Sequence, residues 1–121
     1  MSNVNESLTQ VMDLDGIVAT CVVDSDSGMM LGSAGNTDVF NLEVAAAGNT
    51  EVVRAKRKTM KALDLADDIE DILITLSKQY HIIRPLASNG ALFIYAVLDK
   101  SKSNLAMARL KLAGIEKDLS V

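Results

Sequence analysis

Two almost entirely apolar runs constrain the fold of this chain more than any other feature of its sequence. The runs are IVATCVV at 17–23 and LFIYAVL at 92–98, near opposite ends of a chain of 121 residues. Runs of this kind are typical of strands that are covered on both faces of a sheet. We therefore expect both to be central strands, adjacent to each other in the middle of one sheet.

Three further stretches predict the other strands. DSDSG at 24–28 has the side chains of a turn and lacks the glutamate that ends a calcium loop, so residues 17–34 are interpreted as a hairpin. Residues 70–77 alternate between apolar and polar side chains, as an edge strand does. YHIIRPL at 80–86 precedes the Asn-Gly pair at 89–90, which favours a hairpin into the last apolar run. The pattern predicts a five-stranded antiparallel sheet.

Helical spacing predicts three helices around this sheet. Residues 3–13 form a short helix, residues 37–65 form a long one, and Ser103 is the expected N-cap of the last. Central strands that are apolar on both faces need two covering layers. We therefore expect the long helix on one face and the two terminal helices on the other, in a single α+β domain over residues 1–121.

The long helix has an unusual length and two distinct faces. Its expected N-cap is Asn36 or Thr37. A helix over 37–65 would extend about 43 Å, whereas a domain of this size has a radius of gyration of about 14 Å. Either Gly-Asn-Thr at 48–50 interrupts it, or it has an extra surface to cover. The larger apolar face comprises Leu42, Ala46, Val53, Met60 and Leu63. A second stripe holds only small or β-branched side chains, namely Ala45, Gly48, Val52, Ala55, Thr59 and Ala62.

Composition and motifs argue against several classes of function. A net charge of −4 and an aromatic content of 3% argue against nucleic-acid binding. No apolar run approaches the roughly 20 residues of a membrane span. The first residues lack a signal-peptide pattern, so we expect a cytoplasmic protein. We interpret Cys21, the only cysteine, as a buried apolar residue and His81, the only histidine, as structural. No catalytic constellation, metal site or cofactor motif is predicted.

Charge is segregated in the second half of the chain. Residues 54–61 carry five positive charges, and residues 64–71 carry five negative ones. This pattern is typical of a solvated helix face and loop, and it also suits the steering of a partner or the matching of two copies. The predicted edge strand at 70–77 has no proline and no charge in its middle to prevent pairing with another strand. An open edge and a helix with a surface to cover together predict a homodimer.

Three segments carry a resemblance to a known family. LDKSKSNLAMAR at 98–109 resembles the final strand and helix of the roadblock/dynein-light-chain family, in which Asp and a basic residue lead into an Asn-Leu-Ala run. YHIIRPL at 80–86 resembles the fourth strand of that family, and DSDSGMMLGSAG at 24–35 resembles its first hairpin. The order of the predicted elements matches the family along nearly the whole chain.

The resemblance implies a sheet in the order 2-1-5-4-3 and dimers formed through the long helix and the third strand. It also implies a non-enzymatic scaffold or regulator of a Ras-like small GTPase, of the bacterial or archaeal type, without a cofactor. The dimer is a homodimer or a heterodimer with a paralogue. Carried over by position, the dimer contacts are Val52, Ala55, Thr59, Leu73 and Thr75. The candidate partner surface comprises Arg54, Arg57 and Lys58.

An alternative interpretation is a profilin-like or PAS-like sensory domain, because such domains use similar layers of sheet and helix. That function requires a concave pocket with a few converging polar groups. The residues expected to line it are Cys21, His81 and Tyr95.

Overall fold

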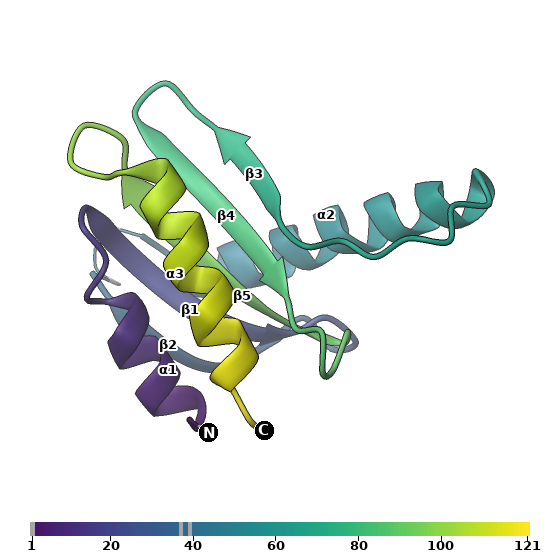
Figure 1. Cartoon of the computed structure of the whole chain (residues 1–121), viewed down its shortest axis with the longest axis horizontal. Coiled ribbons are helices and arrows are strands. Elements are labelled where there is room, and N and C mark those ends of the chain that lie inside the picture. Colours follow the sequence, from purple (N-terminus) through teal and green to yellow (C-terminus); the bar gives the residue numbers. More distant parts are fainter. Residues whose placement is uncertain (1, 37, 39) are drawn as a thin grey trace.

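The computed structural model describes residues 2–36, 38 and 40–121 (Figure 1). The elements follow in the order α1 (Val4–Val11), β1 (Ile17–Asp24), β2 (Met29–Gly35), α2 (Leu42–Ala62), β3 (Ile72–Thr75), β4 (Gln79–Pro85), β5 (Leu92–Asp99) and α3 (Leu105–Asp118).

The five strands form one antiparallel sheet in the order β2-β1-β5-β4-β3. The prediction that the two apolar runs are central and adjacent is confirmed, because β1 pairs with β5 from Ile17 opposite Leu98 to Asp24 opposite Leu92. Seven of the eight residues of β5 are buried, as expected for a strand covered on both faces. Strands β2 and β3 are the two edges of the sheet.

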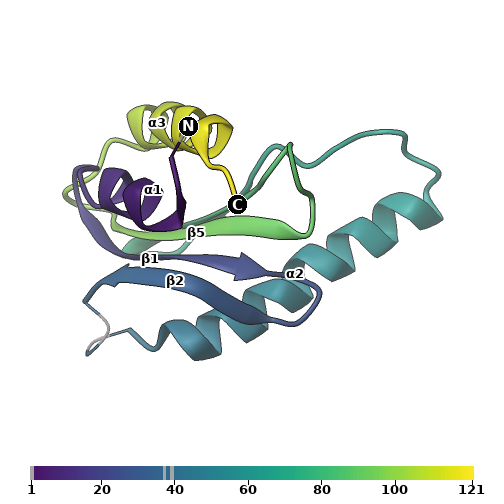
Figure 2. The ribbon, with the colours of Figure 1, turned by 90° about the horizontal axis from the view of Figure 1, so that it is seen from below.

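Helices cover the two faces as predicted (Figures 1 and 2). On one face, α1 and α3 pack in a core with the sheet, to which Leu8 and Leu112 contribute. On the other face, α2 contributes Leu42, Ala46 and Val53 to a second core. The sheet therefore separates two hydrophobic cores, each with its own helical layer.

The long helix is shorter than predicted at both ends. Its N-cap is Asn41, whose side chain accepts a hydrogen bond from the Val44 N–H at 3.2 Å. The alternative cap Asn36 is wrong, because its N–H bonds to the Val18 carbonyl at 3.0 Å and so extends the edge of the sheet. Thr37 lies outside the described residues. Leu63 follows the helix as its C-cap and is 63% exposed. The prediction that it belongs to the buried apolar face is therefore wrong.

The Gly-Asn-Thr stretch at 48–50 does not interrupt α2. Thr50 lies in the buried face of the helix, and its hydroxyl donates to the Ala46 carbonyl one turn earlier at 2.7 Å. This bond satisfies the only polar group that the side chain brings into the core. Of the two alternatives offered by the sequence, the structure therefore has the one in which α2 is continuous and has a further surface to cover.

The last helix begins one residue later than predicted. Asn104 is the N-cap, and its side-chain oxygen accepts from the Met107 N–H at 3.0 Å, so the prediction of Ser103 is wrong. Ser103 instead packs against Gly16, where an added Cβ would lie 2.9 Å from the Ser103 nitrogen. Ser103 therefore lies in the contact with Gly16, one residue before the cap.

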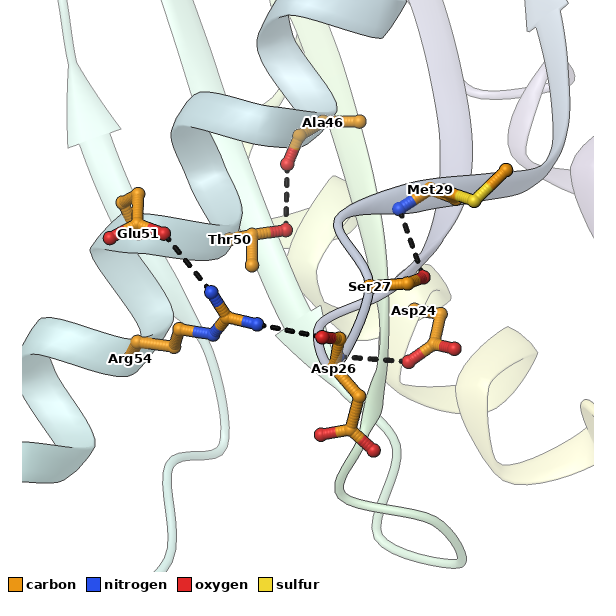
Figure 3. Close-up of polar contacts among 8 residues, drawn as sticks. All are labelled: Asp24, Asp26, Ser27, Met29, Ala46, Thr50, Glu51 and Arg54. Carbon is orange, nitrogen blue, oxygen red and sulfur yellow. Dashed lines mark hydrogen bonds and ion pairs between the residues drawn. The ribbon is translucent and has the colours of Figure 1, made fainter.

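The edge strand β3 is also shorter than the predicted range of 70–77. It ends at Thr75 because the Leu76 N–H already bonds across the following turn to the Gln79 carbonyl at 2.9 Å. The predicted hairpins over 17–34 and between β4 and β5 are both confirmed by the antiparallel pairing. In the first hairpin, the Asp26 N–H donates to the Asp24 carboxylate at 2.9 Å, as expected of a turn (Figure 3).

Candidate interaction surface

Helix α2 is longer than the sheet that it covers is wide. Its 21 residues span about 31 Å, whereas five strands about 4.8 Å apart span about 19 Å. The C-terminal half of the helix consequently projects past the edge at β3 (Figures 1 and 2). The last buried residue of α2 is Val53, and every residue from 54 to 62 is at least partly exposed. We call residues 54–62 the overhang.

The open edge of β3 lies on the side of the sheet from which the overhang projects. β3 pairs with β4 on one side, with Ile74 opposite His81 and Thr75 opposite Tyr80. The Leu76 N–H donates to the Gln79 carbonyl, so this pair of residues is a hydrogen-bonded pair of the antiparallel ladder. Because hydrogen-bonded and non-bonded pairs alternate in antiparallel strands, the N–H groups of Leu73 and Thr75 point away from β4. Both predicted strand contacts thus present backbone groups at the open edge.

The three predicted helix contacts lie on exposed positions of α2. Val52 is 36% exposed, and Ala55 and Thr59 follow it at helical steps of three and four. Val52 also lines a groove of about 680 Å³ between the helix and the segment that leads into β3. The structure therefore brings the helix contacts and the β3 contacts to the same side of the molecule. The groove is lined by Val52, Lys56, Met60, Leu65, Asp67, Asp68, Ile69, Glu70, Asp71 and Ile72.

The predicted partner residues lie on the opposite flank of α2. The spacing of Arg54, Arg57, Lys58 and Lys61 is that of one helical face, which we call the basic flank. Arg54 is held against the β1–β2 turn, because its guanidinium donates to the Asp26 carbonyl at 2.9 Å and to Glu51 at 3.1 Å (Figure 3).

The remaining two predicted partner residues differ in exposure. Lys58 is exposed, whereas Arg57 is half-buried. Arg57 and Lys61 line a second groove of about 810 Å³, which is also lined by the β4–β5 connection and the end of α3. The basic flank therefore forms one wall of a hollow that is large enough to receive part of another molecule.

An ion pair that the sequence analysis missed forms the base of this second groove. Arg84 of β4 donates from Nε to Glu116 of α3 at 3.1 Å, and both side chains are largely buried. The other oxygen of Glu116 accepts from the Ala87 N–H at 3.2 Å. These bonds fasten the C-terminal end of α3 to the β4–β5 connection. The partners are 32 and 29 residues apart, so no local pattern in the sequence indicates them.

A second missed ion pair fixes the segment that leads into β3. Arg109 of α3 donates two bonds to Asp71, at 2.8 and 2.9 Å, in the bidentate arrangement that arginine favours with carboxylates. Among the described residues the ion pairs are Arg54–Glu51, Arg84–Glu116 and Arg109–Asp71. The other charged side chains of the overhang and of residues 64–70 therefore enter no ion pair within the described part of the chain.

The residues of the sensory alternative also come together, beneath Phe40. The Tyr95 hydroxyl lies 3.0 Å from Nδ1 of His81, and Nε2 of His81 lies 2.9 Å from the Gln79 amide oxygen. Because that oxygen only accepts, Nε2 carries the proton and Tyr95 donates to Nδ1. Burial lowers the pKa of His81 and raises the pKa of Cys21 to about 12. At neutral pH the histidine is neutral and the thiol is no nucleophile.

Two features of the described residues bear on other classes of site. No three His, Cys, Asp or Glu side chains within residues 2–36, 38 and 40–121 are grouped so that they hold a metal ion. In the same residues, no helix combines the length and the apolar character needed to cross a bilayer.

The strand order β2-β1-β5-β4-β3, with one long helix on one face and two terminal helices on the other, defines a roadblock/LC7 fold. MglB of Myxococcus xanthus matches 93% of this chain and 88% of its own with a TM-score of 0.82 at 16% identity. A Roadblock/LC7 domain from Streptomyces avermitilis matches 96% and 93% of the two chains with a TM-score of 0.79 at 12% identity.

A third solved structure, an MglB in a tetrameric arrangement, matches 95% of this chain and 88% of its own with a TM-score of 0.75 at 15% identity. No protein-family model matches the sequence, and no curated protein sequence matches it. At these identities the likeness establishes the fold. It confirms the strand order and the helical layers that the resemblance implied.

Proposed function

We propose that this chain is a dimeric, non-enzymatic scaffold or regulator of a Ras-like small GTPase. The proposal is supported by the roadblock/LC7 fold and by the sequence resemblance to a family whose members usually act in this way. The single observation that carries it is the overhang of α2 beside the open edge of β3. Both features leave groups uncovered that a second copy of the chain would cover.

The dimer joins the two sheets edge to edge. An exposed strand edge is a template for pairing, and β3 has neither a proline nor a charge to prevent it. The outward N–H groups of Leu73 and Thr75 then bond to the β3 strand of the partner subunit. The overhang of each copy lies over the partner's sheet, where Ala55 and Thr59, together with Val52 just before the overhang, contribute to the contact.

The GTPase binds on the basic flank, which stays outside this dimer contact. Arg57 and Lys58 provide positive charge, and the adjoining groove of about 810 Å³ provides a concave surface. Complementary charge speeds association and selects the partner more than it adds affinity. We therefore expect the basic flank to govern the rate of complex formation and its sensitivity to salt.

The dimer contact is tested by Thr75→Pro. This change removes an outward N–H group while leaving the bonds between β3 and β4 in place, because Ile74 and not Thr75 bonds to β4. We expect the variant to keep the circular dichroism of the wild type and to become monomeric by light scattering. Thr75→Val, which keeps the N–H, is the matched control and stays dimeric. A dimeric Thr75→Pro protein excludes this edge as the interface.

The GTPase is tested by capture from native extract loaded with a GTP analogue or with GDP, followed by mass spectrometry. We expect a Ras-like GTPase to be enriched in one nucleotide state. The purified GTPase should then bind the double variant Arg57→Glu/Lys58→Glu at least tenfold more slowly, on the scale of electrostatic steering. Lys102→Glu/Lys111→Glu changes the net charge equally outside the basic flank and serves as the control. Recovery of a second copy alone contradicts the GTPase proposal and favours the sensory alternative.

A further inference from the structure

The turn between β4 and β5 exposes the one asparagine of the chain that is followed by glycine. Of the seven asparagines in the sequence, only Asn89 precedes a glycine, Gly90. Both residues are exposed in this turn. The turn also lines the groove of about 810 Å³ beside the basic flank, and Gly90 is one of the lining residues. A chemical change in this turn therefore acts on the candidate partner surface.

We propose that Asn89 is a site of spontaneous deamidation, and that the carboxylate formed there pairs with Arg57 and so removes positive charge from the basic flank. Asparagine is one of the chemically labile residues of proteins. The modification itself depends only on this chain and on water. Its effect on the binding of a GTPase rests on the function proposed above, so the two need separate tests.

The reaction takes place between the Gly90 nitrogen and the side-chain amide of Asn89. The Gly90 N–H gives its proton to hydroxide, and the nitrogen forms a bond to Cγ of Asn89. The bond from Cγ to Nδ2 breaks, and Nδ2 takes a proton from water and leaves as ammonia. Water then adds to one of the two carbonyl carbons of the cyclic imide, and the bond from that carbon to the nitrogen breaks. The acid formed gives its proton to ammonia, so the products are ammonium and a carboxylate on an aspartate or isoaspartate backbone at position 89.

The turn holds these groups in an arrangement that favours the reaction. The Ala91 N–H donates to Oδ1 of Asn89 at 3.2 Å. This bond stabilises the negative charge that Oδ1 acquires when the Gly90 nitrogen attacks Cγ, as the donors of an oxyanion hole do. The Gly90 N–H donates to no other group within the described part of the chain, so no hydrogen bond has to break. Because Gly90 has no side chain, its nitrogen is not shielded by one.

The other six asparagines lack this combination. They precede valine, glutamate, threonine or leucine, whose side chains hinder the approach to the backbone nitrogen. Asn3, Asn41 and Asn104 are also helix N-caps, and their side-chain oxygens accept hydrogen bonds from N–H groups of the first helical turn. The structure therefore distinguishes Asn89 as the labile position.

Arg57 is the cation that the new carboxylate meets. A Cβ added to Gly90 would lie 3.7 Å from Nη2 of Arg57, so this guanidinium lies against the turn. Arg57 belongs to none of the ion pairs among the described residues, so its charge has no fixed partner there. The carboxylate arises one residue before this contact. An ion pair between the two withdraws positive charge from the surface that an approaching partner meets.

Peptide mapping by mass spectrometry tests the modification. Purified protein is incubated at neutral and at mildly alkaline pH beside the synthetic peptide LASNGAL, which corresponds to residues 86–92. We expect conversion at Asn89 at a rate within about tenfold of that of the peptide, because exposed turns remain mobile. Conversion should be faster at the higher pH, and the other six asparagines should keep their amides over the same time. Protein that keeps the Asn89 amide while the peptide is converted overturns the site.

Gly90→Ala is the matched variant for the attacking group. It keeps Asn89, and the added Cβ makes an ordinary van der Waals contact with Arg57. We expect conversion to be at least about tenfold slower, because the methyl group shields the nitrogen and restricts the backbone. Equal rates in this variant and in the wild type contradict attack by the nitrogen of residue 90.

Titration of Asn89→Asp by nuclear magnetic resonance tests the ion pair. We expect the pKa of the new carboxyl group to lie below its ordinary value of about 3.9, because the Arg57 guanidinium favours the charged form. In Asn89→Asp/Arg57→Gln the pKa should return to that value. Asn89→Asp/Lys58→Gln removes the same charge from the basic flank away from the turn, and here the pKa should stay low. Equal pKa values with and without Arg57 overturn the ion pair.

The effect on binding is measured with the GTPase captured from extract. Asn89→Asp should bind it about threefold more slowly than the wild type, and this difference should vanish when Arg57 is replaced by glutamine in both proteins. Equal rates for Asn89→Asp and the wild type overturn the loss of charge at the basic flank. A wild-type protein that binds no GTPase refutes the proposed function, whereas the deamidation and the ion pair are measured on the isolated chain. Binding of the GTPase without conversion at Asn89 preserves that function and refutes this inference.

Discussion

On one face of the sheet, α1 and α3 pack beside each other and close a core. On the other face α2 alone packs against the sheet and then projects past the edge at β3 (Figures 1 and 2). The closed face is fastened by two ion pairs that join α3 to distant segments, Arg84–Glu116 and Arg109–Asp71. The open face has one exposed ion pair within a single helix, Arg54–Glu51.

The difference between the two faces shows which part of the chain provides stability and which part offers a surface for binding. Burial of apolar area stabilises a fold in proportion to the area removed from water, and the closed face uses both of its helices for this purpose. Helix α2 buries its first half in the same way but leaves residues 54–62 outside the core. The surface available for a second molecule is consequently concentrated on the open face.

The largest contrast is expected between apolar truncations on the two faces. Replacing Leu112 of α3, which is 1% exposed, by alanine should cost about 4 kcal/mol, because the change removes buried contacts and leaves a cavity. Val52→Ala, at a 36% exposed position of α2, should cost the single subunit less than about 1 kcal/mol. Urea unfolding at low protein concentration measures both. Equal losses would contradict the division into a closed and an open face.

A smaller contrast is expected between the ion pairs of the two faces. Glu116→Ala leaves Arg84 largely buried without its partner and removes the acceptor of the Ala87 N–H, so it should lower the free energy of unfolding by about 3 kcal/mol. Arg54→Ala on the open face should change it by less than about 1 kcal/mol, because the pair with Glu51 is exposed to water. Thermal unfolding of the two variants at equal concentration measures both losses of stability. A larger loss for Arg54→Ala than for Glu116→Ala would contradict this comparison.

The smallest effect concerns pH and the polar cluster on the open face. Burial holds the pKa of His81 below its ordinary value of 6.5. As the pH falls through about 6.5, the unfolded chain therefore takes up the proton first, and the free energy of unfolding decreases. This stabilisation is present at higher pH and is lost as the pH falls below about 6.5. His81→Gln should flatten the dependence between about pH 7.5 and 5.5, as measured by urea midpoints. If stability changes with pH equally in the wild type and in His81→Gln, groups other than His81 cause the pH dependence.

The sequence predicted the sheet and its layers because the relevant signals are local. The runs at 17–23 and 92–98 carry apolar side chains on both faces of the strand, so they fit only in the middle of a sheet that is covered on both faces. The alternation at 70–77 likewise identified the edge, although the strand itself is limited to Ile72–Thr75. The helix caps were predicted less well, because several Asn, Ser and Thr residues precede each helix and tertiary contacts select among them.

The candidate surface was predicted only in part, for a different physical reason. Helical periodicity alone separates the basic flank, with Arg57 and Lys58, from the side of α2 that carries Val52 and Ala55. The periodicity does not tell which flank lies beside the open edge, because that depends on the angle at which α2 crosses the sheet. The sequence likewise contains no sign that Arg54 bonds to the carbonyl of Asp26, 28 residues away.

The sequence by itself therefore determined the order of elements, the central strands, the covered faces and the excess length of the long helix. These follow from side-chain polarity at the periods of strand and helix, which each segment expresses alone. Only the tertiary structure decided that the excess length lies beyond β3, that Arg84 and Arg109 fasten α3, and that Leu73 and Thr75 direct their N–H groups outward. Those features arise from contacts between segments far apart in the chain, and their geometry is set when the layers pack together.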